Sequence, residues 1–159
     1  MTVSGSCVGS DTVTLFDGGI AIHGATATCW HSAWSMTVTL GVGSHTLTAT
    51  QTDSVSGLPS VPSAGTVTTV YAPPAAPQFT GPTSSTSPVP VTGTGVPGDT
   101  LTLVVDSHTT YTVTIAANGT WSFSLSLSTG SHSLSATQTS AVPVVLTSSA
   151  ATMTVSVHH

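Results

Sequence analysis

The chain contains no lysine, no arginine and no glutamate, and its only formal charges are five aspartates. A chain without cationic side chains has no basic patch, which excludes nucleic acid as a partner and removes any attraction to anionic membrane surfaces. Long apolar runs are also missing, because none approaches the roughly 20 residues that span a bilayer. Membrane insertion is therefore not expected, although the mean hydropathy is positive at +0.36.

The sequence also lacks a sustained apolar spacing of 3.6 residues, so almost no helix is expected. Apolar residues instead alternate with serine and threonine, for example in "WSFSLSL" (121–127) and "WSMTVTL" (34–40). Successive side chains of a strand point to opposite faces, so this pattern predicts strands with one buried and one solvated face. The abundant hydroxyl groups provide the polar surface that charged side chains usually supply.

Three segments of the first half of the chain return in the second half. Residues 3–15, "VSGSCVGSDTVTL", match residues 91–103, "VTGTGVPGDTLTL". The segment "WSMTVTL" matches "WSFSLSL", and "GSHTLTATQT" (43–52) returns as "GSHSLSATQT" (130–139) with only threonine-to-serine changes. The spacing between matches changes by one residue between Leu15 and Trp34. Such self-similarity indicates two copies of one structural unit.

Each copy has the size and the turn signals of a small all-β domain. We expect domain 1 over residues 1–73 and domain 2 over residues 74–159, joined by the proline-rich segment "YAPPAAPQ", whose composition favours an extended, semi-rigid connection. The dipeptide Asn118-Gly119 is a strong hairpin signal between two alternating segments. Strands of the second copy are expected near 77–81, 88–94, 99–105, 110–116, 120–127, 131–139 and 150–157. Seven short antiparallel strands are typical of an immunoglobulin-like β-sandwich.

The first copy begins one strand later than the second. Val3 already corresponds to Val91, whereas the second copy has the segment "APQFTGP" (76–82) ahead of that position. We therefore expect the first domain to lack its initial strand and to have an unpaired strand edge near residues 2–6. Unpaired edges are templates for added strands, so upstream residues of a longer protein or a neighbouring molecule are expected to cover this one.

These segments resemble the bacterial Ig-like repeats of large secreted and cell-surface proteins. The resemblance rests on "VTGTGVPGDTLTL", "NGTWSFSL" and "GSHSLSATQT", together with the variant "TATCWHSAWSMTVTL" of the first copy. It implies an extracellular or bacterial cell-surface location and a non-enzymatic spacer role in an adhesin stalk, with neighbouring Ig-like modules as partners. Because such modules serve several purposes, two alternatives stay open. They are a binding module for a glycan or protein partner and an accessory domain of a secreted hydrolase.

The two cysteines of the chain, Cys7 and Cys29, both lie in the first copy. Their counterparts by sequence matching are Gly95 and Ala116, so the second copy lacks both, as expected of a pair. In an Ig-like sheet they are expected at the same end of two strands that have a third strand between them. We predict a disulfide, which suits a secreted protein. Two free thiols are the alternative.

The tryptophans separate into two classes. Trp34 and Trp121 are equivalent and are expected in the two cores, with Met36 and Phe123 beside them on the same faces. Trp30 has no counterpart. It either packs over the disulfide or is exposed with His31 as a possible binding surface, since exposed aromatic side chains often contact carbohydrate or protein.

No motif in the sequence predicts catalysis, a metal site or a cofactor. There is no Gly-x-Ser-x-Gly segment and no pair of carboxylates at a fixed spacing. His23 and His31 lie near Cys29, but four ligands with the spacing of a structural zinc site are not visible. We interpret the equivalent residues His45 and His132 as half-exposed strand residues.

Overall fold

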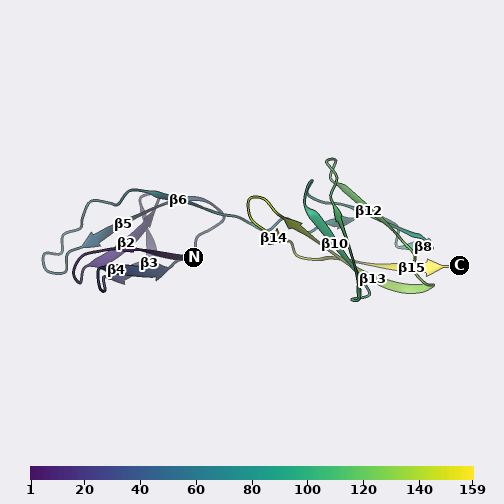
Figure 1. Cartoon of the computed structure of the whole chain (residues 1–159), viewed down its shortest axis with the longest axis horizontal. Coiled ribbons are helices and arrows are strands. Elements are labelled where there is room, and N and C mark those ends of the chain that lie inside the picture. Colours follow the sequence, from purple (N-terminus) through teal and green to yellow (C-terminus); the bar gives the residue numbers. More distant parts are fainter. The chain divides into compact units, whose positions relative to one another are not determined.

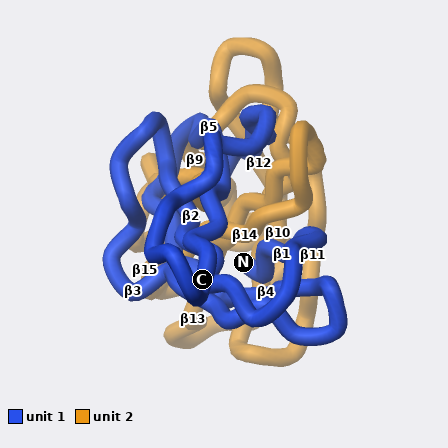
Figure 2. The backbone as a smooth tube through the Cα atoms, turned by 90° about the vertical axis from the view of Figure 1, so that its left-hand side faces the viewer, with its two compact units in different colours: residues 1–71 blue, residues 72–159 orange.

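The computed structural model describes residues 1–159, and all its extended secondary structure is β-strand (Figure 1). The all-β prediction is thus confirmed, and the structure contains no helix with the length and apolarity needed to cross a bilayer. The chain divides into two compact units, Met1–Tyr71 (unit 1) and Ala72–His159 (unit 2), which are coloured separately in Figure 2.

Unit 2 is a β-sandwich of nine strands. The strands are β7 (Gln78–Phe79), β8 (Ser84–Thr86), β9 (Val89–Thr94), β10 (Thr100–Val105), β11 (Thr109–Thr114), β12 (Thr120–Leu125), β13 (Gly130–Ser140), β14 (Leu146–Thr147) and β15 (Ala151–His158). One sheet has the order β11-β10-β13-β15-β8, with β14 beside β13, and the other has the order β12-β9-β7. Every predicted strand position contains a strand, and the short strands β8 and β14 are additional.

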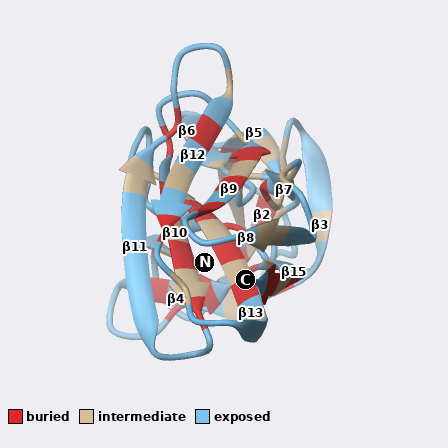
Figure 3. Ribbon diagram, turned by 90° about the vertical axis from the view of Figure 1, so that its right-hand side faces the viewer, coloured by how far each residue is buried: buried red, intermediate tan, exposed pale blue.

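The core of unit 2 lies between its two sheets. It combines buried side chains of β9 and β12 from one sheet with side chains of β10, β13 and β15 from the other. Leu101, Leu103 and Val105 alternate along β10 with half-buried residues, which reproduces the period of two seen in the sequence (Figure 3). Alternation along the strands therefore places the apolar face of each sheet inward.

The first strand of unit 2 is shared between the two sheets. β7 pairs antiparallel with β9 at Gln78 and Phe79, whereas β8 pairs parallel with β15. This segment therefore closes one side of the sandwich, because it bonds to the outer strand of both sheets.

Unit 1 has the same arrangement with six strands. They are β1 (Thr2–Ser6), β2 (Thr12–Asp17), β3 (Ile20–Thr28), β4 (Ala33–Thr37), β5 (Gly43–Thr52) and β6 (Thr66–Val70). The sheets β3-β2-β5-β6 and β1-β4 correspond to the β11-β10-β13-β15 and β9-β12 parts of unit 2. No strand of unit 1 corresponds to β7 or β8, so the prediction that the first copy lacks its initial strand is confirmed.

The length difference between the copies results from two hairpins, not one. In unit 1 a bulge lies in the β2–β3 pairing between Thr14 and Phe16, where unit 2 has a regular pairing of β10 with β11. The next turn is shorter in unit 1, where Trp30 bonds to Ala33, than in unit 2, where Ala116 bonds to Thr120. The sequence matching detected only the net change of one residue.

Candidate functional site

Cys7 and Cys29 form a disulfide, with their Cα atoms 5.8 Å apart. Cys7 follows β1 and Cys29 follows β3, and these strands belong to different sheets. The expected placement in one sheet, with a third strand between them, is therefore wrong. The disulfide instead connects the two sheets of unit 1, and both cysteines belong to its buried core.

The counterpart of Cys29 in unit 2 is Ile115, which corrects the sequence match to Ala116. The Cys29 N–H donates to the carbonyl oxygen of Asp11 at 2.8 Å, and the Ile115 N–H makes the same bond to Asp99 at 2.9 Å. A Cβ atom added to Gly95, the counterpart of Cys7, would lie 2.6 Å from Cδ1 of Ile115. Unit 2 therefore fills the position of the disulfide with an isoleucine side chain packed on a glycine.

Trp34 and Trp121 occupy equivalent core positions. Trp34 pairs with Gly5 in β1, and Trp121 pairs with Gly93 in β9. Both are buried, with exposed fractions of 9% and 3%. Met36 is buried in the core of unit 1, and the ring of Phe123 lies 6.2 Å from that of Trp121.

Unit 1 has an open groove where unit 2 has its first strand. The groove has a volume of about 700 Å³ and lies between β1 and the chain that leads into β6. Its lining includes the core side chains Val13, Leu15, Trp34 and Leu47. The groove therefore opens into the core of unit 1 along the unpaired edge of β1, which bonds only to β4.

Trp30 and His31 lie at the tip of a hairpin in unit 1. Trp30 and Ala33 exchange two backbone hydrogen bonds, and the two central residues, His31 and Ser32, have positive φ angles of 49° and 63°. Asparagine and glycine are the usual residues of such a turn. The Trp30 side chain is 73% exposed, and its ring centroid lies 4.8 Å from that of His31. Trp30 is thus a surface residue.

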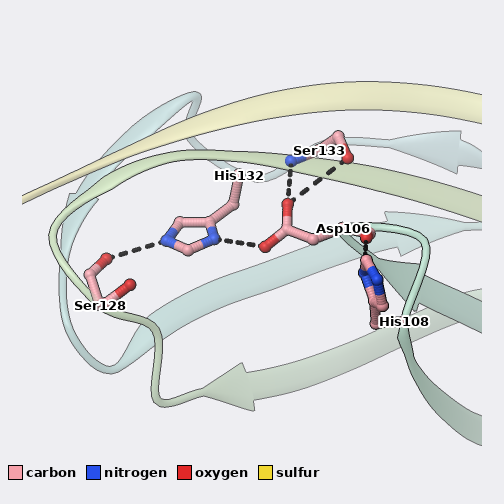
Figure 4. Close-up of polar contacts among 5 residues, drawn as sticks. All are labelled: Asp106, His108, Ser128, His132 and Ser133. Atoms are coloured by element: carbon pink, nitrogen blue, oxygen red, sulfur yellow. Dashed lines mark hydrogen bonds and ion pairs between the residues drawn. The ribbon is translucent and has the colours of Figure 1, made fainter.

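His132 joins two loops of unit 2 to strand β13 (Figure 4). Its Nδ1 atom lies 2.7 Å from Oδ2 of Asp106, and its Nε2 atom lies 2.9 Å from the carbonyl oxygen of Ser128. The other carboxylate oxygen of Asp106 accepts a hydrogen bond from the Ser133 N–H at 2.8 Å. Both ring nitrogens face acceptors, so the doubly protonated ring satisfies both.

The same set of contacts occurs in unit 1. We call it the clamp: a histidine bonded to an aspartate carboxylate through one ring nitrogen and facing a backbone carbonyl through the other. His45 contacts Oδ2 of Asp17 at 2.6 Å through Nδ1, and the carbonyl oxygen of Gly41 at 2.9 Å through Nε2. The two histidine side chains are 15% and 12% exposed in units 1 and 2. They are thus strand residues, as expected, but their side chains are more covered than the half-exposure expected, and their bonds to aspartate were not foreseen. Sequence matching hides the partners, because Asp17 ends β2 whereas Asp106 lies in the turn after β10.

These contacts raise the pKa of the histidine in both clamps. The hydrogen bond to Asp17, with a smaller contribution from the Gly41 carbonyl, raises the pKa of His45 above its usual 6.5. The bonds to Asp106 and Ser128 raise the pKa of His132 in the same way. His132, followed by the Ser133 N–H, also lowers the pKa of Asp106. In both clamps the contacts with aspartate and with a backbone carbonyl therefore favour the protonated histidine ring.

The structure brings together no group of three or more His, Cys, Asp or Glu side chains that could hold a metal ion. His23 lies on β3 and is exposed, and Cys29 is bonded to Cys7. The clamp histidines and aspartates of both units instead connect loops to strands.

Two solved structures are similar to the chain in fold. No curated protein matches the chain. Among solved structures, the fibronectin(III)-like modules of Clostridium thermocellum CbhA are 17% identical with a TM-score of 0.41, over 99% of this chain and 89% of that chain. The BSP domain of a biofilm-associated protein is 20% identical with a TM-score of 0.42, over 98% of this chain but only 27% of that one.

The family model of the bacterial Ig-like domain matches residues 77–156, just over half of the chain. The match begins one residue before β7 and ends within β15, so it spans the sandwich of unit 2. Unit 1 repeats its sequence segments and its strand order. The chain belongs to the bacterial Ig-like domain family.

Proposed function

We propose that the chain is a non-enzymatic spacer segment of an extracellular or cell-surface bacterial protein, of the kind found in adhesin stalks. One observation carries the proposal. The polar residues that are repeated in both units bond loops to strands, and so they support the fold. The repeated segment "GSHxLxATQT" supplies the clamp histidines and the glutamines Gln51 and Gln138. Each of these glutamines accepts a hydrogen bond from a loop N–H, at Val8 and Val96. The exposed pair Trp30 and His31 is not repeated.

The disulfide and the composition support an extracellular setting. Disulfides persist in oxidising compartments, and a chain without lysine or arginine offers no cleavage site to trypsin-like proteases. The absence of lysine also excludes Lys–Asn isopeptide crosslinks, and the only two cysteines of the chain are paired with each other in Cys7–Cys29.

Single-molecule stretching of the whole chain tests the spacer role. Two separate unfolding events are expected, one from each unit. The disulfide locks a segment with a sequence separation of 22 residues, so reductant should lengthen the extension of unit 1 by about 80 Å, at roughly 3.6 Å per residue. A single merged event, or a chain that extends without a resolved event, contradicts two modules that carry load in series.

A binding module is the second candidate, and the exposed Trp30–His31 hairpin favours it. Tryptophan supplies a large apolar contact surface with a polar edge, and the positive φ angles hold this tip in an uncommon conformation. A glycan array and a protein pull-down, each run with the chain and with Trp30→Ala, separate the two functions. Saturable binding that the variant loses supports the binding module, whereas the spacer role predicts no signal above background.

A further inference from the structure

Strand β11 of unit 2 is an outer strand with no neighbour on one side. It stands at one end of the sheet order β11-β10-β13-β15-β8 and pairs only with β10. All its residues are exposed except Val113, which is half-buried (Figure 3). The outer edge of β11 is therefore open to solvent along its whole length.

The hydrogen bonds between β10 and β11 fix which backbone groups of β11 face outward. The Ile115 N–H donates to the carbonyl oxygen of Asp99 at 2.9 Å. In an antiparallel pair every second residue bonds to the partner strand, and the register of β10 with β11 has no shift. The residues whose N–H and C=O groups face away from β10, without a partner in the chain, are therefore Thr110, Thr112 and Thr114.

The sequence of β11 contains none of the features that commonly protect an open edge. Those features are charged side chains, proline and β-bulges. Residues 109–114, TTYTVT, have no charge and no proline, and their pairing with β10 contains no bulge. Threonine, tyrosine and valine are also enriched in strands, whereas the outer strand of the other sheet, β12, has serine between its apolar residues. β11 thus combines an open edge with a sequence that favours a further strand.

The counterpart of β11 in unit 1, β3, has a protected edge. Residues 22–25 lie opposite Leu15 alone, because the register with β2 shifts between Thr14 and Phe16. Within this bulge Gly24 has a positive φ of 74°, a left-handed conformation that interrupts the strand. A bulge bends its strand and disrupts the ladder. The two copies therefore differ in this edge, and only β11 offers an uninterrupted one.

We propose that β11 is a dimerisation edge, at which two copies of the chain pair their β11 strands antiparallel about a two-fold axis. Thr112 pairs with its own counterpart in the second copy, and Thr110 pairs with Thr114, so the outward-facing backbone groups of both strands are satisfied. Tyr111 comes opposite Val113, and aromatic side chains opposite β-branched ones stabilise antiparallel strands. No charged side chain lies on either strand to repel the other.

The same pairing continues a row of threonines across both copies. Thr112 lies opposite Thr102 of β10, which in turn lies opposite Thr137 of β13. Because Thr112 is on the two-fold axis, the row runs on through the second copy, and cross-strand threonine pairs are favourable. An interface that uses the same patch on both subunits closes on itself. The product is therefore a dimer, and its formation does not depend on the spacer role.

Cysteine crosslinking of the whole chain tests the position of the two-fold axis. Directly opposite residues of a bonded antiparallel pair have Cα atoms about 5.5 Å apart, which is within the range of a disulfide. Thr112→Cys should therefore form a disulfide-linked dimer under mild oxidation. The matched variant Ser122→Cys, at an exposed position of the outer strand β12, should not. Equal crosslinking of the two variants, or crosslinking of Ser122→Cys alone, overturns the proposal.

Sedimentation of the chain without added cysteines gives a second, independent measurement. A monomer–dimer equilibrium is expected between micromolar and millimolar concentration. Thr112→Lys should weaken it at least about tenfold, because two like charges then lie directly opposite each other, whereas Ser122→Lys should leave it unchanged. Both substitutions are at exposed positions, so both variants should fold. A chain that stays monomeric at millimolar concentration, or a dimer that Thr112→Lys does not weaken, overturns the proposal.

Discussion

Units 1 and 2 stabilise the same sandwich in different ways. Unit 1 connects its sheets with the disulfide Cys7–Cys29 and leaves one side open, whereas unit 2 packs Ile115 on Gly95 and closes that side with β7 and β8. The histidine–aspartate clamps and the buried tryptophans are common to both. The shared elements define the module, and the covalent crosslink is a separate device added to it in unit 1.

The largest expected effect is the loss of a core tryptophan. Trp121→Ala should destabilise unit 2 by about 3–5 kcal/mol, because it removes a buried aromatic side chain and leaves a cavity that a closed sandwich cannot fill. Trp34→Ala should cost unit 1 less, since Trp34 already borders the open groove. Denaturant unfolding followed separately for each unit measures both values. A loss below about 1 kcal/mol for Trp121→Ala would mean that its side chain does not face the core.

The disulfide should contribute the next largest effect, and only in unit 1. For a crosslink with a sequence separation of 22 residues, the restriction of the unfolded chain amounts to about 3 kcal/mol. Reduction should therefore lower the stability of unit 1 by about this amount and leave unit 2 unchanged. Thiol titration of the unfolded, unreduced protein should find no free cysteine, and two reactive thiols would contradict the bond.

A double variant makes the disulfide comparison sharper. Cys7→Gly combined with Cys29→Ile copies the Gly95–Ile115 packing of unit 2 into unit 1. It should regain part of the stability that the reduced wild-type protein loses, whereas Cys7→Ala with Cys29→Ala should not. Equal stability of the two double variants would show that Ile115 does not take the place of the crosslink.

The smallest expected effect is the pH dependence of the two clamps, of which the part that comes from the histidines should be alike in both units. Because the pKa values of His45 and His132 are raised in the folded state, their contribution is fully present below the unfolded value of about 6.5 and is lost as the pH rises through the folded values. At the acid end, the lowered pKa of Asp106 makes its contribution disappear as the pH falls through that value. The signs follow from linkage between protonation and folding.

Histidine-to-glutamine variants test the clamps one unit at a time. His45→Gln should flatten the decline of stability between mildly acidic and mildly alkaline pH in unit 1, and His132→Gln should do so in unit 2. NMR titration of the ring protons measures the two pKa values directly. A pKa at or below 6.5 for both rings would contradict the ion-pair geometry.

The period of two and the internal repeat were enough to predict the strands, the core tryptophans and the missing first strand. These features depend on local alternation, which is visible in sequence. The split of the first strand into β7 and β8 was not predictable, because it depends on pairing with β15, which is distant in the chain. The partner of each histidine was missed because Asp17 aligns with Val105, so that Asp106 lies one position later, in the turn after β10. The counterpart of Cys29 was missed because a bulge lengthens the β2–β3 pairing of unit 1.

The central claim is that units 1 and 2 are one fold in an open and a closed form, and amide hydrogen exchange across β1 and β9 tests it most directly. Exchange in each strand is compared with the slowest exchange of its own unit, so that a difference in global stability cancels. The account predicts that amides of Thr2–Ser6 exchange through local opening, far faster than the core of unit 1, whereas those of Val89–Thr94 exchange as slowly as the core of unit 2. Equal relative protection of the two strands would contradict it.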